Sequence, residues 1–179
     1  AHYPSGSAQY HINAAIAQAL ELYVTATDDE TILLDGGAEL LWETARLWLD
    51  VGTYSPAHDG KFCIFGVTGP DEYSALVDNN YYTNRMAALH LQYAAKCCRD
   101  LAQRYPEAWQ AISKRIQLDE REPELWSAAA DAMHLPYDSR LDIDAQDERF
   151  LARPRLPQAA DGSGPLLLSL HPLTLYRHQ

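Results

Sequence analysis

The feature that most constrains the fold is a long apolar stripe at helical spacing in the middle of the chain. Its members recur every three or four residues, as on one face of an α-helix: Tyr82, Met86, Leu89, Tyr93, Cys97 and Leu101. Asp78 or Asn79 is expected to cap the start of this helix, and Tyr105 followed by Pro106 ends it. The sequence therefore indicates a mainly helical protein.

Further helices are expected on both sides of this one. Thr27 and Glu30 fit a capping box for a helix that Gly52 closes, with a bend at Gly36 and Gly37. The helix before it, over about residues 9–26, has its own apolar stripe: Ile12, Ile16, Leu20 and Tyr23. The stripe of the capped helix is also regular: Leu34, Ala38, Leu41, Ala45 and Trp48. Weaker patterns predict helices through residues 109–116 and 125–133.

Extended structure is expected only in short pieces. Asp59 and Gly60 form a turn signal, and residues 61–65 have the composition of a strand. Residues 166–170 form an apolar run that fits either a strand or a buried connector. The predicted architecture up to about residue 135 is therefore helix pairs joined by irregular loops, without βαβ alternation.

Composition excludes several classes of function. A formal net charge of -11 and a pI near 4.9 argue against a nucleic-acid platform or an anionic membrane surface. No apolar run is long enough to span a membrane. The three cysteines, Cys63, Cys97 and Cys98, form no C-x-x-C pair and are expected to be reduced apolar fillers. A reducing cytoplasmic location is the simpler interpretation.

Candidate chemistry gathers between residues 66 and 84. There Asp71 and Tyr73 flank Glu72, and both neighbours favour a raised pKa for that carboxyl. A carboxyl that stays protonated near neutral pH can protonate the leaving oxygen of a glycoside. Four polar residues that follow could hydrogen-bond sugar hydroxyls: Asp78, Asn79, Asn80 and Asn84. The same stretch also fits a plain turn followed by a capped helix.

Other site chemistries have little support. The seven histidines are scattered and form neither H-x-x-x-H nor H-x-x-E-H, so no metal site is expected. There is no G-x-S-x-G elbow, no P-loop and no G-x-G-x-x-G. His11 and Asn13 stand near the start of a helix, where their spacing alone fits capping or solvated polar groups.

Two motifs resemble the signature of glycoside hydrolase family 65, which contains the maltose, trehalose and kojibiose phosphorylases. They read G-P-D-E-Y at residues 69–73 and V-D-N-N-Y-Y-T-N at 77–84. The similarity extends to Y-H-I-N-A-A-I at 10–16, G-A-E-L-L-W-E-T-A-R at 37–46, A-A-A-D-A-M-H-L-P-Y-D at 128–138 and Q-D-E at 146–148. The resemblance covers nearly the whole chain and is weak only around residues 150–165.

The resemblance implies a fold and a reaction. The fold would be mainly α, a partial (α/α)6 barrel with short extended segments. Glu72 would be the general acid of an inverting phosphorolysis, in which inorganic phosphate attacks an α-glucosyl disaccharide and gives β-glucose 1-phosphate. No cofactor is implied. The substrate-binding candidates are His11, Asn13, Asp71, Tyr73, Asp78, Asn79, Asn80 and Asn84.

Two other functions stay open at this point. A hydrolase of the same family, similar to trehalases, would use water in place of phosphate. A non-catalytic helical sugar-binding module would need no proton donor, so the presence of Glu72 argues against it. The sequence leaves the choice of disaccharide and the oligomeric state open, a homodimer included.

The chain departs from the family pattern in three places. Family members usually have an acidic residue where this chain has Ala14 or Ala15. The sequence stops at Gln179, where the family continues into a Lys-Gln-Ala-Asp helix, and an upstream tryptophan-aspartate motif is absent. Residues 1–179 are therefore expected to be a central segment of the catalytic domain, truncated at both ends and inactive alone.

Overall fold

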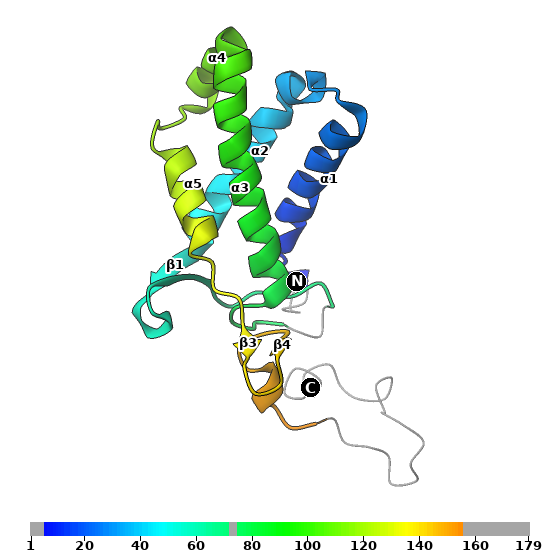
Figure 1. Cartoon of the computed structure of the whole chain (residues 1–179), viewed down its shortest axis with the longest axis vertical. Coiled ribbons are helices and arrows are strands. Elements are labelled where there is room, and N and C mark those ends of the chain that lie inside the picture. The colour runs from blue at the N-terminus through cyan, green and yellow to red at the C-terminus, as the bar shows by residue number, and fades with distance from the viewer. Residues whose placement is uncertain (1–5, 72–74, 156–179) are drawn as a thin grey trace.

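The computed structural model describes residues 6–71 and 75–155, and these form a helical layer with short extended segments (Figure 1). The α-helices are α1 (His11–Thr27), α2 (Ala38–Val51), α3 (Tyr81–Arg104), α4 (Pro106–Ile116) and α5 (Glu122–Asp131). A π-helical turn, η2 (Leu33–Gly37), leads into α2. Short 3-10 turns occur at η3 (Pro56–His58) and η4 (Phe150–Ala152).

The strands form two small antiparallel pairs. β1 (Gly52–Ser55) pairs with β2 (Lys61–Ile64), and β3 (Tyr137–Asp138) pairs with β4 (Ile143–Asp144). The predicted strand at 61–65 is confirmed, whereas its partner β1 has no clear strand signal in the sequence. Asp59 and Gly60 form the expected turn between β1 and β2, with φ values of 52° and 75°.

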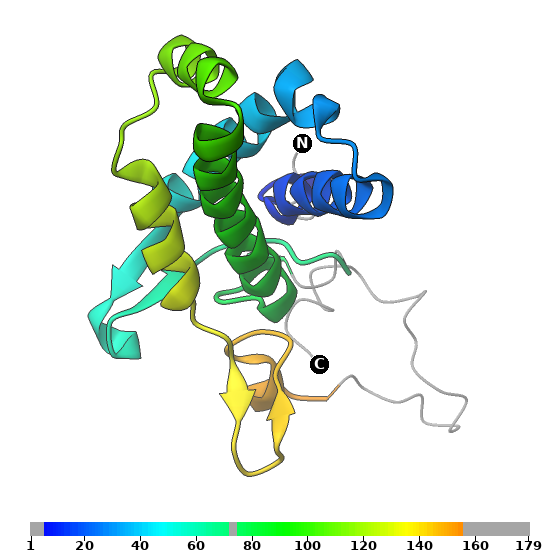
Figure 2. The same cartoon turned by 45° about the horizontal axis from the view of Figure 1, so that its top comes forward.

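α3 is the central element of the fold. It packs against α1, α2, α4 and α5, and both views show it running between α1 on one side and α5 on the other (Figures 1 and 2). Its two cysteines and Cys63 are buried and free, which confirms their predicted role as apolar fillers. The largest side chains around it are fully buried: Trp42, Trp48 and Trp126.

A buried histidine joins α2 to α3. The indole Nε1 of Trp48 donates to His90 Nδ1 at 2.9 Å, and His90 Nε2 lies 3.0 Å from the Leu41 carbonyl oxygen. These partners assign the proton of the neutral imidazole to Nε2. Burial lowers the pKa of His90 to about 4, against the opposite effect of the Leu41 carbonyl. His90 is therefore a neutral core residue near pH 7.

The helix predicted over about residues 9–26 is confirmed as α1, but most of its apolar stripe does not face the core: of the four stripe residues, Leu20 packs against it. Ile12 and Ile16 are each 49% exposed, and Tyr23 is 41% exposed, whereas Ala14 and Ala17 are each 1% exposed. The small alanine side chains let α1 approach α3 closely, so the larger residues lie outside that contact. In the part of the chain that the structure describes, α1 thus presents an apolar face to solvent.

Two predicted helix caps are also corrected. Thr27 is the last residue of α1, and its hydroxyl donates to the Tyr23 carbonyl at 2.7 Å. The side chain that accepts a backbone N–H at the start of the next helix is Asp29, not Thr27, and it accepts from Thr31 at 2.9 Å. At the start of α3 the N-cap is Asn80, not Asp78 or Asn79. The left-handed backbone at the preceding asparagine shifts the cap by one residue.

The bend predicted before α2 is confirmed. Asp35 and Gly36 have non-helical backbone angles inside the π-helical turn, and Gly36 has a φ of 107°. A side chain at that φ would be strained. At Gly37, a Cβ atom would lie 2.6 Å from the Ile32 carbonyl oxygen, so close backbone approach also requires a glycine there.

One ion pair ties α2 to the start of α5. Arg46 donates to both carboxylate oxygens of Glu122 at 2.7 and 2.8 Å and to the Ile116 carbonyl at 3.1 Å. Burial raises the pKa of Glu122, but the Arg46 hydrogen bonds, the Asp119 backbone N–H and the charge of Arg46 together outweigh it, so the net shift is downward. The pair therefore stabilises the fold above the ordinary carboxyl pKa and loses this effect as the pH falls through the lowered value.

Replacing Arg46 with methionine should destabilise the protein by about 2–3 kcal/mol, because charged hydrogen bonds are lost while the aliphatic stem remains. Urea denaturation of the full-length protein at pH 7 would measure this loss. The difference from wild type should shrink as the pH falls below about 4.5, the ordinary pKa of Glu122. Arg121→Met, at an exposed pair with Asp119, is the matched control and should leave the midpoint unchanged. An equal midpoint for Arg46→Met and wild type would contradict this role.

Candidate functional site

The predicted acid belongs to a loop whose two ends are tied together. β2 leads the chain into Gly66, which has a φ of 65°. Val67 and Val77 then exchange two backbone hydrogen bonds of 2.9 Å, so the chain between them forms a closed loop. Glu72 and Tyr73 lie in this loop but outside the described residues. The described residues at its edges are Asp71, which is exposed, and Ala75, which is buried.

Three further contacts fix the base of this loop. Asp78 Oδ1 accepts from the Gly66 backbone N–H at 3.0 Å. The Thr68 N–H donates to the Ala8 carbonyl at 3.1 Å, which joins the loop to the segment before α1. The Asn79 N–H donates to the Ile64 carbonyl at 2.8 Å. The carboxylate of Asp78, predicted to bind substrate, thus also holds the backbone at the start of the loop.

Asn79 is the polar centre beneath the loop. It is 0% exposed and has a φ of 49°, a conformation that asparagine tolerates better than most residues. Its Oδ1 accepts from the Ile64 N–H and from Asn84 Nδ2, each at 3.2 Å, and its Nδ2 donates to Glu148 Oε2 at 2.7 Å. These bonds connect β2, α3 and the segment after β4.

Asn80 and Asn84 are buried in the same region. Asn80 Oδ1 accepts from the Thr83 N–H at 3.0 Å and caps α3. Asn84 Nδ2 donates to the His134 carbonyl at 2.8 Å. The side chains of Asn79 and Asn80 and the Nδ2 of Asn84 bind the protein itself and so support the loop, whereas the buried Asn84 Oδ1 has no hydrogen-bond partner among the described residues. Contact with sugar stays a prediction for all of the candidate residues.

The two candidates on α1 lie in different surroundings. His11 packs edge-on against the Tyr82 ring, with centroids 5.9 Å apart, and burial lowers its pKa against the effect of a hydrogen bond with the Thr68 backbone. The structure therefore brings His11 beside the loop. Asn13 Nδ2 instead donates to the Tyr10 carbonyl at 3.2 Å, within the first turn of its own helix.

Residues 146–148 support the loop from the other side, and local sequence pattern did not assign them to the site. The Gln146 carbonyl accepts from the Tyr81 N–H at 2.9 Å, and the Glu148 N–H donates to the Asp78 carbonyl at 3.2 Å. The Gln146 side chain also donates to the Asp71 carboxylate. The only signal for these residues in the sequence was their part in the family resemblance.

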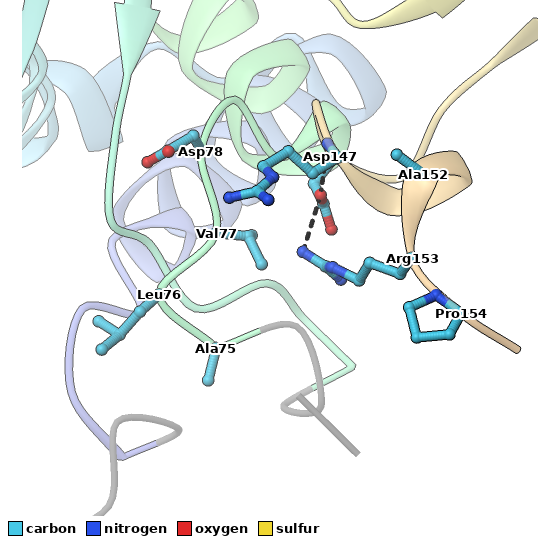
Figure 3. A pocket seen from close by; sticks show the side chains of 9 residues that line it. Ala75, Leu76, Val77, Asp78, Asp147, Ala152, Arg153 and Pro154 are labelled. Atoms are coloured by element: carbon cyan, nitrogen blue, oxygen red, sulfur yellow. Dashed lines mark hydrogen bonds and ion pairs between the residues drawn. The ribbon is translucent and has the colours of Figure 1, made fainter. Parts of the chain in front are cut away.

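A pocket of about 400 Å³ opens between the loop and residues 147–154 (Figure 3). Asp147 lines it and is 1% exposed. Its Oδ1 accepts from the Arg153 guanidinium at 2.9 Å and from the Arg149 N–H at 3.0 Å, and Figure 3 shows the Asp147 and Arg153 side chains pointing toward one another. Burial raises the pKa of Asp147, with a further contribution from the Asp71 charge, against the lowering effects of Arg149 and Arg153.

Two other classes of site find no support in the described part of the chain. Among residues 6–71 and 75–155, no cluster of three or more histidine, cysteine or acidic side chains is arranged to hold a metal ion. Within the same residues, no helix is both long and apolar enough to cross a membrane.

Comparisons with known sequences match this chain to members of one enzyme family along most or all of its length. A model of the glycosyl hydrolase family 65 central catalytic domain matches residues 1–174. An alpha,alpha-trehalose phosphorylase from Thermoanaerobacter brockii is 48% identical over 181 residues, which cover 100% of this chain and 23% of that protein. A kojibiose phosphorylase from the same organism is 35% identical over 146 residues, or 82% of this chain and 19% of that protein.

Two more matches extend the comparison. An uncharacterised glycosyl hydrolase of Mycobacterium tuberculosis is 40% identical over 100% of this chain and 22% of its own length. A solved structure provisionally assigned as a kojibiose phosphorylase, from the human microbiome, superposes with a TM-score of 0.75 at 23% identity, over 93% of this chain and 23% of that one. The predicted fold class, a mainly α portion of an (α/α)6 barrel, is thereby confirmed. The chain spans less than a quarter of the length of these relatives.

Proposed function

This chain belongs to glycoside hydrolase family 65, and on that premise we propose that it is a central segment of an enzyme that phosphorolyses an α-glucosyl disaccharide. The observation that carries the proposal is the 48% identity to a trehalose phosphorylase along the whole chain. Trehalose is therefore the first substrate to test, and inorganic phosphate is the co-substrate. No cofactor enters the proposed reaction.

Glu72 is the general acid of the proposed reaction. Its carboxyl proton passes to the glycosidic oxygen as the bond from that oxygen to the anomeric carbon breaks. A phosphate oxygen bonds to the anomeric carbon from the opposite face, so the α-glucoside gives β-glucose 1-phosphate and a released sugar. Solvent returns a proton to the Glu72 carboxylate for the next turnover.

The surroundings of the loop support an acid with a raised pKa. Asp71 is the sequence neighbour of Glu72, and its charge already contributes to the raised pKa of the nearby Asp147 carboxyl. A negative charge of this kind favours the protonated form of a neighbouring carboxyl group. The exposed Asp71 carboxylate and the His11 ring beside the loop are the described groups that we propose contact the sugar.

A hydrolytic reaction is the second candidate, because the 40% identical mycobacterial relative is named only as an uncharacterised glycosyl hydrolase. Water would then replace phosphate, and Glu72 would keep the same role. A second carboxylate would be needed as the general base that takes a proton from the attacking water. We place the enzyme in the cytoplasm, because three free, buried cysteines fit a reducing compartment.

The requirement for phosphate separates the two reactions. The full-length parent enzyme would be assayed with trehalose, kojibiose, maltose and nigerose, each with and without inorganic phosphate. Glucose release that needs phosphate supports the phosphorylase. Equal release without phosphate supports the hydrolase, and no release from any of the four sugars contradicts both reactions.

A further inference from the structure

The turn between β1 and β2 is fastened to the segment after β4 by a histidine. His58 Nε2 lies 3.0 Å from Glu148 Oε1, and His58 Nδ1 lies 2.9 Å from Ser55 Oγ. Because a carboxylate only accepts, Nε2 carries a proton and donates to Glu148, while Nδ1 of the neutral ring accepts from the Ser55 hydroxyl. When His58 takes up a further proton, the hydroxyl rotates and accepts from Nδ1. Both contacts therefore persist in either charge state of His58.

Glu148 carries this fastening to the base of the loop. Its Oε2 accepts from Asn79 Nδ2 at 2.7 Å, and Asn79 Oδ1 accepts from the Ile64 N–H at the end of β2. Burial raises the pKa of Glu148, but the hydrogen bonds from His58 and Asn79 and the charges of His58 and His134 outweigh it, so the net shift is downward. One ionised carboxylate thus joins the β1–β2 hairpin to the base of the loop.

A second imidazole packs against the first. The rings of His58 and His134 meet edge to face, with centroids 4.8 Å apart. His134 and Glu148 also line a pocket of about 320 Å³, through which solvent reaches them. Burial lowers the pKa of His134, the charges of His58 and Lys61 lower it further, and the charge of Glu148 acts against them. His134 therefore takes up a proton less readily than an ordinary histidine.

The other titratable groups around these rings do not replace the Glu148 carboxylate. Asp138 and Arg140 line the same pocket but form an ion pair of 2.9 Å with each other. Cys63 on β2 is buried, and burial raises the pKa of its thiol, so it stays neutral. Among the described residues, Glu148 is the one carboxylate that bonds to either imidazole.

We propose that His58, His134 and Glu148 form a pH-sensitive latch, which holds the β1–β2 hairpin against the segment after β4 near neutral pH and weakens in acid. Glu148 balances one protonated imidazole, but two protonated rings at 4.8 Å exceed its charge and repel one another.

The direction of the pH effect follows from His134. Because its pKa is lowered while the latch is closed, its contribution is complete above the ordinary histidine value of 6.5 and is lost as the pH falls toward the lowered value. The lowered pKa of Glu148 has the same sign, but it acts below the ordinary value of 4.5 for that group. The histidines therefore account for any weakening between these two values.

Hydrogen exchange of the full-length enzyme, followed by mass spectrometry at about pH 7.5 and about pH 5.5, tests the latch on either side of the histidine range. Protection factors correct for the effect of pH on the intrinsic exchange rates. In peptides that cover β1 and β2, they should fall by about two- to fivefold at the lower pH, the size expected for a partly exposed charge interaction. α4 contains no histidine and should change little, so it is the internal reference.

Two substitutions assign this effect to the ring pair. His134→Gln and His58→Gln each leave one imidazole beside Glu148, so each should flatten the pH dependence, and the double variant should flatten it no further. Lys96→Gln, at an exposed pair with Asp100 on α3, is the matched control and should retain the wild-type dependence. Equal falls in the hairpin and in α4 would indicate global loosening and overturn the latch. A wild-type hairpin unaffected by pH, or a dependence that survives in either histidine variant, would also overturn it.

A second readout reports the charges themselves. Carbon-13 NMR of histidine-labelled enzyme, with the ring assigned from His134→Gln, follows the titration of His134. In His58→Gln the pKa of His134 should rise toward its ordinary value, because the repelling charge is gone while the burial remains. An unchanged pKa would contradict the latch. Neither readout involves turnover, so the outcome does not depend on the proposed reaction.

Discussion

Replacing Glu72 with glutamine is expected to lower kcat for disaccharide phosphorolysis by about 10²- to 10⁴-fold, the usual contribution of a general acid. Glutamine keeps the size and hydrogen-bonding capacity of the side chain but cannot supply the proton. Substrate affinity should change little, because the proton is transferred only in the transition state. Steady-state kinetics on the full-length enzyme measure both quantities.

A substrate with a better leaving group gives a sharper test of the same role. Fluoride departs without full protonation, so α-glucosyl fluoride should react with the Glu72→Gln variant far closer to the wild-type rate than the disaccharide does. Glu107→Gln, at an exposed position on α4, is the matched control and should be as active as wild type on both substrates. Equal losses on the fluoride and the disaccharide would contradict the acid role.

The second large effect is expected at Asn79. Asn79→Ala removes one hydrogen bond from each of three partners: the Ile64 N–H, Asn84 Nδ2 and the Glu148 carboxylate. Because Asn79 and Asn84 are fully buried, water cannot replace the lost amide at the Ile64 N–H or Asn84 Nδ2, whereas Glu148 is exposed and keeps its bond to His58. The free energy of unfolding should fall by about 3–5 kcal/mol. Urea denaturation of the full-length protein would measure the change.

Two companion variants separate the causes of this loss. Asn79→Gly accepts a φ of 49° without strain, so it should lose the hydrogen bonds alone and retain slightly more stability than Asn79→Ala. Asn13→Ala, which removes only a local bond to the Tyr10 carbonyl, should cost about 1 kcal/mol or less. If Asn79→Ala were no more damaging than Asn13→Ala, the buried network would not be what holds the loop.

The parts of the fold that follow local rules were predictable from the sequence. The period of the α3 stripe indicated its helix, and positive φ angles at Asp59, Gly60 and Gly36 confirm the predicted turn and bend. Each depends on backbone preferences within a few residues. The apolar stripe of α1 did not indicate which side of the helix packs against α3. Periodicity shows that a helix has an apolar side, but not which neighbour covers that side. The alanines, which carry little hydrophobic signal, form the actual contact.

The support of the site was not predictable from local pattern. Gln146 and Asp71 are 75 residues apart, and Asn79 and Glu148 are 69 apart. No spacing rule connects such pairs, because the fold alone brings them together. The burial of Asn79, Asn80 and Asn84 was hidden for a related reason: an asparagine-rich stretch looks like a solvated binding loop until the elements that cover it are known.

The most direct test of inverting phosphorolysis is the anomeric form of the product. Full-length enzyme would be incubated with trehalose and inorganic phosphate, and proton NMR would follow the anomeric signals from the first minutes. The proposed reaction predicts β-glucose 1-phosphate, formed only with phosphate present and lost in Glu72→Gln. Initial formation of α-glucose 1-phosphate, or of free glucose alone without phosphate, would contradict it.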